Sequence, residues 1–201
     1  EGISPGTPTI SLGNNNGIFI NGKNKVIIVN LNFAGGNTVG RYAIAINNSY
    51  DCLIKENYIG QMVGCQLTGG SYRNQIINNI FYTGDDELLI SGANRNLINC
   101  NQFTEAVNTG IWLKNSSQDN IINANAINNC LQGVYCQSGA NNIISNNRIT
   151  NDDSATYDSA IWIDAQGDRT VITGNNLIGV GAVTEIFNSG TNTQIAHNIT
   201  S

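Results

Sequence analysis

Three acidic residues stand next to one another in the stretch TGDDELLI (83–90): Asp85, Asp86 and Glu87. Charged residues make up only 11% of the chain, so this cluster needs a physical reason. Paired carboxylates can cleave glycosidic bonds, because crowding raises the pKa of one acid and makes it a proton donor. Carboxylate oxygens also suit calcium, and Asp and Gly are common in tight turns. These three interpretations stay open until the elements that position the acids are known.

The chain contains a repeat in which an Asn follows an Ile by three residues. Successive copies are separated by 22, 22, 24, 22, 28 and 23 residues, and most have another apolar residue two places after the Asn. The copies are Ile54/Asn57, Ile76/Asn79, Ile98/Asn101, Ile122/Asn125, Ile144/Asn147, Ile172/Asn175 and Ile195/Asn198. Repeats of this length are typical of solenoids, in which each unit buries its apolar face by stacking on its neighbours.

A second short strand is expected in each unit, with side chains that alternate between interior and solvent. These strands read GIFI (17–20), AIAI (43–46), GCQL (64–67), ELLI (87–90), GIWL (110–113), GVYC (133–136) and AIWI (160–163). Strands of successive units should lie parallel and about 4.8 Å apart. The stacked Asn side chains could then donate to one neighbour and accept from the other. Asn also tolerates the left-handed backbone that a sharp bend needs.

The repeat resembles that of the right-handed parallel β-helix superfamily, which includes pectate lyases, polygalacturonases, phage tailspikes and surface adhesins. The segments that resemble it are NQIINNIF (74–81), NLINCNQF (96–103), NIINANAI (120–127) and NIISNNRI (142–149). The resemblance implies an all-β fold, a right-handed single-stranded parallel β-helix of about eight coils with an internal Asn ladder. We expect residues 1–201 to form one such domain, as part of a longer protein or a repeating assembly.

The alternation of the second strands predicts an outward row of aromatic side chains. In GIWL (110–113), Ile111 and Leu113 point inward and Trp112 points outward, and the same register puts Tyr135 and Trp162 outward in the next two units. Such a row could bind sugar rings, pack on another chain, or be covered by the nearby connections. Lys114, at the end of the Trp112 strand, is the nearest basic residue and a further candidate for substrate binding.

The repeat also gives the acids a position. Glu87 begins its strand in a column that is otherwise filled by Gly or Ala, and Glu105 lies at the matching edge of the next unit. Carboxylates from adjacent coils could lie roughly 5–9 Å apart, as glycoside hydrolysis requires. Asp85, Asp86, Glu87 and Glu105 are therefore the candidate catalytic residues. Asp85 and Asp86 also resemble the Asp-Asp pair of polygalacturonases, although the third acid, the His and the basic clamp of that pattern are missing.

Composition excludes several classes of function. The net charge is −5, and the 9 Lys and Arg residues are scattered, so the chain lacks the basic surface that nucleic acid requires. It has no run of about 20 apolar residues that would predict a membrane span. The 5 Cys residues form no CxxC pair, and with a single His they favour buried thiols over a metal centre. Calcium at the acids is the only cofactor left open.

Two functional hypotheses follow. In the first, the protein binds or cleaves a polysaccharide or cell-surface glycan along the aromatic and acidic strand face. In the second, it is a non-catalytic solenoid: a fibre, adhesin or virion module. Both imply a location outside the cell, at the cell surface or on a virion. Strand edges at the ends of a solenoid also suggest a homo-oligomer, either a trimer or an end-to-end stack.

Overall fold

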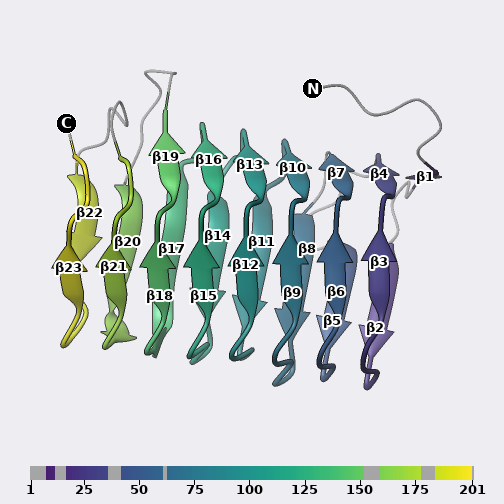
Figure 1. The fold of residues 1–201 in the computed structure, drawn as a ribbon, viewed down its shortest axis with the longest axis horizontal. Coiled ribbons are helices and arrows are strands. Elements are labelled where there is room, and N and C mark those ends of the chain that lie inside the picture. The colour runs from purple at the N-terminus through teal and green to yellow at the C-terminus, as the bar shows by residue number, and fades with distance from the viewer. Residues whose placement is uncertain are drawn as a thin grey trace.

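The computed structural model describes residues 8–11, 17–35, 42–60, 63–151, 159–177 and 184–200. These residues form a parallel β-solenoid in which each complete coil adds one strand to each of three sheets (Figure 1). No helix occurs in the described ranges. The sheets contain seven, eight and eight strands, so the solenoid has about seven full turns, slightly fewer than the eight expected.

Sheet 1 follows the Asn bend and has the order β1 (Thr9–Ser11), β4 (Asn32–Ala34), β7 (Tyr58–Gly60), β10 (Ile80–Tyr82), β13 (Gln102–Thr104), β16 (Ala126–Asn128), β19 (Arg148–Thr150). Sheet 2 holds the longest strands, β2 (Ile18–Asn21), β5 (Tyr42–Asn47), β8 (Val63–Thr68), β11 (Asp86–Ser91), β14 (Thr109–Lys114), β17 (Gln132–Ala140), β20 (Ser159–Asp168), β22 (Thr184–Asn188). Sheet 3 contains β3 (Ile27–Val29), β6 (Leu53–Lys55), β9 (Gln75–Ile77), β12 (Leu97–Asn99), β15 (Ile121–Asn123), β18 (Ile143–Ser145), β21 (Val171–Thr173), β23 (Gln194–Ala196).

Columns of identical or similar apolar residues form the core. In sheet 3, Ile98 pairs with Ile76 on one side and Ile122 on the other, and all three side chains are fully buried. In sheet 1 the rings of Phe81 and Phe103 stack, with centroids 4.7 Å apart and planes 6° from parallel. Burial of these columns supplies the apolar contacts that a single coil cannot make alone.

The predicted inward positions of sheet 2 are confirmed. Ile111 and Leu113 are fully buried, whereas Trp112 between them is only half-buried. The same holds along the sheet for the inward residues Cys65, Leu67, Leu88, Ile90, Val134, Cys136, Ile161 and Ile163. The outward face of sheet 2 is therefore the face that presents the aromatic row.

The predicted Asn ladder is present. Asn79 Nδ2 donates to Asn101 Oδ1 at 3.0 Å, and Asn101 Nδ2 donates to Asn125 Oδ1 at 3.1 Å. Each ladder oxygen also accepts the main-chain N–H of the preceding ladder residue, as Asn101 Oδ1 does from Asn79 at 2.9 Å. The ladder continues from Asn57 to Asn198. Buried amides are thereby satisfied at the corner between sheets 3 and 1.

A second ladder lies at the corner between sheets 2 and 3, and sequence reasoning missed it. Asn74 Nδ2 donates to Asn96 Oδ1 at 3.1 Å, and Asn96 Nδ2 donates to Asn120 Oδ1 at 3.0 Å. Asn142 extends this ladder, and all four residues are buried. Its signal was an Asn directly before each of the four strands β9, β12, β15 and β18, obscured by the many other Asn residues of the chain.

The left-handed backbone at the bend belongs to the residue before each ladder Asn, rather than to the ladder Asn itself. Asn78, Cys100 and Ala124 have φ values of 56°, 55° and 54°, and each precedes a ladder position. The ladder residues stay in ordinary conformations because their side chains must point inward to meet one another. The expectation that Asn was selected for a left-handed φ therefore misplaces the strained residue by one position.

Four of the five cysteines are buried free thiols, as predicted, and Cys100 is the exposed exception. Its position before Asn101 in a left-handed bend turns its side chain away from the core. Burial raises the pKa of Cys65 to about 12, so this thiol is unreactive.

Glu87 breaks the apolar interior. Side chains in the Glu87 column of sheet 2 point inward at the corner with sheet 1. At Gly64, in the same column, an added Cβ would lie 2.8 Å from the Phe81 ring. The Glu87 side chain follows the same direction and is 1% exposed, and neither carboxylate oxygen has a hydrogen-bond partner. Burial, with a smaller contribution from the Glu105 charge, holds the pKa of Glu87 well above its ordinary value. The main-chain groups of Thr104 and Gly84 lie near the carboxylate but outside hydrogen-bond geometry, and they oppose the shift only in part.

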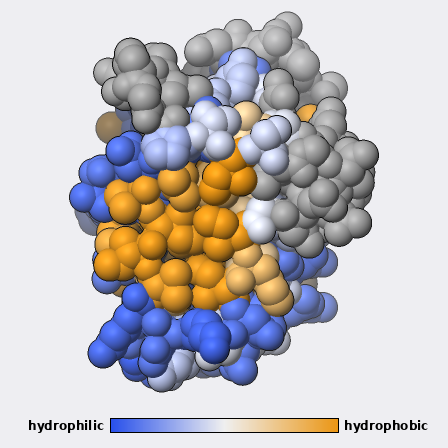
Figure 2. Space-filling view, turned by 90° about the vertical axis from the view of Figure 1, so that its right-hand side faces the viewer, coloured by the Kyte–Doolittle hydropathy of each residue, from blue (hydrophilic) through white to orange (hydrophobic). Residues whose placement is uncertain are grey.

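The first coil exposes part of the core at the end of the solenoid. Figure 2 shows an apolar patch there, bordered by hydrophilic residues. Ile18, Val26 and Leu31 of this coil pack on the core but are only partly buried.

Replacing Asn101 by Ala should destabilise the protein by roughly 3 kcal/mol or more. The change leaves the main-chain N–H and Nδ2 of Asn79 and the carbonyl of Ile76 without the partners that Asn101 supplies. Urea unfolding measures the loss. Gln102→Ala, an exposed neighbour, is the control and should change stability by less than about 1 kcal/mol. Equal effects of both changes would contradict a structural role for the ladder.

Replacing Glu87 by Gln should flatten the dependence of stability on pH. The pKa of Glu87 is raised above 4.5 on folding, so above that pH the folded state binds more protons than the unfolded state. The contribution of Glu87 is therefore fully present below its ordinary pKa and declines as the pH rises, by at most about 1.4 kcal/mol per pH unit. Urea midpoints between about pH 5 and pH 8 should fall more steeply for the wild type than for Glu87→Gln. The exposed Glu56→Gln is the control, and parallel curves for Glu87→Gln and the wild type would refute the buried-acid assignment.

Candidate functional site

The outward face of sheet 2 presents a continuous aromatic row over four coils. The rings of Trp112 and Tyr135 stack, with centroids 5.9 Å apart and planes 12° from parallel. Trp162 follows at 5.7 Å from Tyr135, tilted by 60°. Phe187 extends the row, 4.8 Å from Trp162 and 40% exposed. The sequence prediction missed Phe187 because its strand, TEIFN, lacks the small residue that opens most of the other strands. Its signal was an apolar pair, Ile186 and Phe187, in register with Ile161 and Trp162.

Polar side chains fix the rings of this row. Lys114 Nζ lies 4.0 Å from the centroid of the Trp112 ring, a cation–π contact. The Tyr135 hydroxyl donates to Asp164 Oδ2 at 3.2 Å. Lys114 thus belongs to the same surface as the predicted aromatic residues, and its ammonium group is held against Trp112.

A pocket of about 200 Å³ lies where the aromatic row meets the acidic segment. Its lining residues are Asp86, Asn108, Thr109, Trp112, Leu131, Gln132 and Tyr135. The pocket combines two aromatic rings with hydroxyl, amide and carboxylate groups. Such a mixture can bind a ligand that has both apolar faces and hydrogen-bonding groups.

Among the described residues that line this pocket, Asp86 is the only acid. Burial and then the neighbouring Asp85 charge raise the pKa of Asp86 to about 6. The main-chain N–H and the hydroxyl of Thr109 donate to the carboxylate and oppose this shift, as does the positive charge of Lys114. Asp86 is therefore protonated in part of the population near neutral pH.

The other predicted acids lie outside the pocket lining. Asp85 Oδ1 accepts a hydrogen bond from Asn108 Nδ2. The exposed Glu105 carboxylate accepts a hydrogen bond from Tyr82 at the end of β10 in sheet 1, which raises the pKa of the Tyr82 hydroxyl. Glu87 points into the core. The structure therefore brings Asp86, Trp112 and Tyr135 together, and it separates Glu87 and Glu105 from them.

The acidic segment is also the place at which calcium is predicted. Within the described part of the chain, no group of three or more His, Cys, Asp or Glu residues is placed to hold a metal ion. The inward turn of Glu87 removes the third carboxylate from Asp85 and Asp86. Among the described residues, no helix is long and apolar enough to cross a membrane.

The chain resembles solved structures in fold, at low sequence identity. Among the curated proteins, no sequence matches this chain. Solved structures match it well. A variant of the periplasmic alginate epimerase AlgG shares 13% sequence identity at a TM-score of 0.82, with 95% of this chain and 49% of that chain covered. PfbA, a surface adhesin of Streptococcus pneumoniae, shares 15% identity at a TM-score of 0.68, with 96% and 60% covered.

DFA-IIIase from Arthrobacter chlorophenolicus A6 shares 13% identity at a TM-score of 0.62, with 86% of this chain and 53% of that chain covered. The chain thus spans about half the length of the structures it matches. Identities this low show a common fold. Residues 16–177 match the family described as "Right handed beta helix region". The match covers most of the chain, and the protein therefore belongs to the right-handed β-helix family.

Proposed function

We propose that the protein binds a polysaccharide along the outward face of sheet 2. The observation that supports this best is the meeting of Asp86, Trp112 and Tyr135 in one pocket that continues into the aromatic row. Aromatic rings bury the apolar faces of sugar rings, and the amide and hydroxyl groups of the lining can hydrogen-bond sugar hydroxyls. The row crosses successive strands, which favours a chain-like ligand over a single small molecule.

Solved relatives by fold support a carbohydrate ligand. Two of them carry names that refer to carbohydrates, an alginate epimerase and DFA-IIIase, and a third is a surface adhesin. One of these proteins is periplasmic and one is at a cell surface, so we propose that this protein also acts outside the cytoplasm. Assembly into a trimer or an end-to-end stack, location on a virion and calcium at the acids remain predictions.

Binding is favoured over cleavage because glycoside hydrolysis uses two carboxylates, and the described residues of the pocket lining supply one. The non-catalytic solenoid of our second hypothesis is compatible with this role, since binding through an exposed face requires no cleavage. The aromatic row is then the main source of affinity, and Asp86 orients the ligand through hydrogen bonds.

Trp112→Ala and Trp162→Ala should each weaken polysaccharide binding about tenfold, because each removes one ring from the row. Affinity electrophoresis in gels that contain neutral or acidic polysaccharides measures retention. Phe19→Ala is the matched control, since Phe19 is 61% exposed in the same outward column but four coils from Trp112. Unchanged retention with an altered mass in solution would instead assign the row to contact between chains.

Cleavage is the second candidate, and the raised pKa of Asp86 favours it. A proton donor with a pKa of about 6 is protonated below that pH, so release of reducing ends should decline as the pH rises through it. Asp86→Asn should abolish this release by at least about a hundredfold while binding persists. Glu56→Gln, which changes an exposed acid outside the pocket lining, is the control and should leave the release unchanged. Activity that survives Asp86→Asn, or a wild type that releases no reducing ends, would exclude this candidate.

A further inference from the structure

A second surface with ligand-binding chemistry lies at the corner between sheets 2 and 3, at the lower edge of Figure 1. Here each coil places one residue in a column that runs along the solenoid. Isolated bridges pair Asn24 with Tyr50, Tyr50 with Tyr72, and Tyr72 with Asn94. The column therefore contains two tyrosines between two asparagines.

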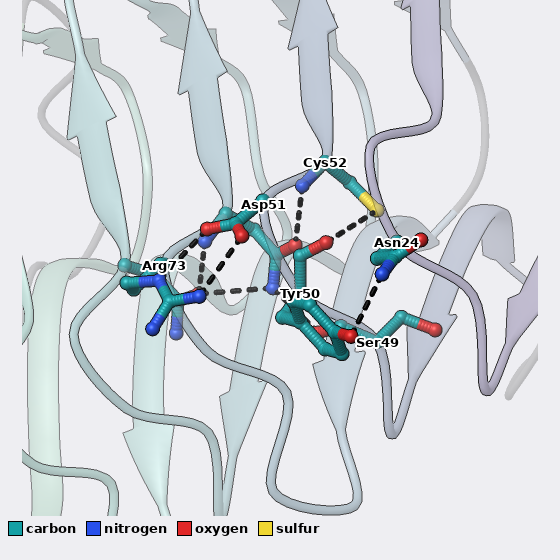
Figure 3. Close-up of polar contacts among 8 residues, drawn as sticks. Asn24, Ser49, Tyr50, Asp51, Cys52 and Arg73 are labelled. Atoms are coloured by element: carbon teal, nitrogen blue, oxygen red, sulfur yellow. Dashed lines mark hydrogen bonds and ion pairs between the residues drawn. The ribbon is translucent and has the colours of Figure 1, made fainter.

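The two tyrosine rings form a fixed stack. Their centroids are 5.1 Å apart and their planes are 16° from parallel. On the Tyr50 side, Asn24 Nδ2 donates to the Tyr50 hydroxyl at 2.7 Å (Figure 3). Arg73 donates two hydrogen bonds to Asp51, at 2.8 and 2.9 Å, which hold its guanidinium group near the rings.

Arg73 lies beside the stack and leaves its far end open. Its Cζ atom is 4.7 Å from the Tyr72 centroid and 5.8 Å from the Tyr50 centroid. If the guanidinium group were stacked on the far face of Tyr72, its Cζ atom would lie much farther from the Tyr50 centroid than from the Tyr72 centroid, because the two rings are themselves 5.1 Å apart. The guanidinium group therefore flanks the pair, and the face of Tyr72 that points away from Tyr50 is not covered by it.

The next residue of the column does not cover this face either. Asn94 is short, and its Oδ1 accepts the main-chain N–H of Gln118 at 3.0 Å, which turns its side chain toward the following coil. A hollow of about 250 Å³ remains beside Tyr72. Its lining residues are Gly70, Tyr72, Asn94, Arg95, Gln118 and Asp119. Gly70 leaves this space unfilled. A Cβ at this position would project into open space, with no atom within 4 Å, and the φ of +78° disfavours any residue with a side chain.

The rim of the hollow offers donors and acceptors with no net charge. Arg95 Nε lies 3.6 Å from Asp119 Oδ2, and both side chains are partly solvent-exposed. Asp119 Oδ1 also accepts a hydrogen bond from Asn141 Nδ2 at 3.1 Å, which fixes the carboxylate. The amide of Gln118 is exposed at the same rim. One flat apolar wall inside a neutral ring of hydrogen-bonding groups matches a sugar, which has an apolar ring face and hydroxyls around its edge.

We propose that this hollow binds one neutral pyranose unit, which stacks on Tyr72 as the third ring of the Tyr50–Tyr72 stack. The site is separate from the pocket beside Asp86 on sheet 2. Thr109, at the start of β14, lines the pocket, whereas Gln118 and Asp119 lie beyond the other end of this strand, which is roughly 20 Å long. The proposal does not depend on polysaccharide binding in that pocket.

The test uses methyl β-glucopyranoside, methyl β-galactopyranoside and N-acetylglucosamine as probes, with NMR of the Tyr ring signals. At least one probe should shift the Tyr72 resonances with a Kd in the millimolar range. Tyr72→Ala should weaken that binding at least tenfold, whereas Trp112→Ala should leave it unchanged. Tyr58→Ala, which removes a half-buried Tyr ring from sheet 1, is the matched control and should also leave it unchanged.

Asn94→Tyr keeps the test decisive if Tyr72→Ala fails to fold. A tyrosine at this position would extend the stack and occupy the place of the sugar, so binding should be lost while the urea midpoint is kept. Wild-type affinity in folded Asn94→Tyr would overturn the proposal. So would the absence of a Tyr72 shift with all three probes, or a shift with glucuronate alone, which would require a net positive site.

Discussion

The amide–amide hydrogen bond between Asn side chains of adjacent coils is the interaction on which this solenoid depends. Asn79, Asn101 and Asn125 each donate Nδ2 to the next ladder oxygen, and each oxygen also accepts a main-chain N–H. Together with the main-chain ladders of the three sheets, these bonds hold adjacent coils at one strand spacing, and they fix the direction of the corner. The aromatic row, the pocket beside Asp86 and the Tyr50–Tyr72 stack all follow from this spacing, because each is built from one residue per coil.

Much of the fold could be predicted from the sequence. The repeat of Ile98 and Asn101 gave the coil, and alternation around Trp112 gave the interior and the outward face. The alternation of inward and outward side chains failed at Glu87, which points inward like its neighbour Leu88. Alternation with a period of two residues holds within a strand but not at the corner where β11 begins. Gly64 and Gly110, in the same column, have no side chain whose burial would reveal that the corner turns inward.

The site could be predicted in part. The outward row was visible because Trp112, Tyr135 and Trp162 follow one register. The grouping of the acids was not, because the length of a connection does not determine where its side chains point. Asp86 of sheet 2 reaches the pocket, whereas the Glu105 carboxylate is directed toward Tyr82 of sheet 1. A hollow such as the one beside Tyr72 is also invisible in sequence, since it arises from the direction of the Asn94 side chain.

The ladder has a polarity that bears on how the chain folds. In the bonds between ladder side chains, each Asn from Asn57 to Asn175 donates Nδ2 to the oxygen of its C-terminal neighbour. A coil that is already in place therefore presents amide donors, and the coil that follows it in the chain supplies the acceptors. Because contacts join neighbouring coils only, growth can proceed one coil at a time in the order in which a ribosome releases them. The Asn side chains thus act as a directional template, as the end of a growing filament does for its next subunit.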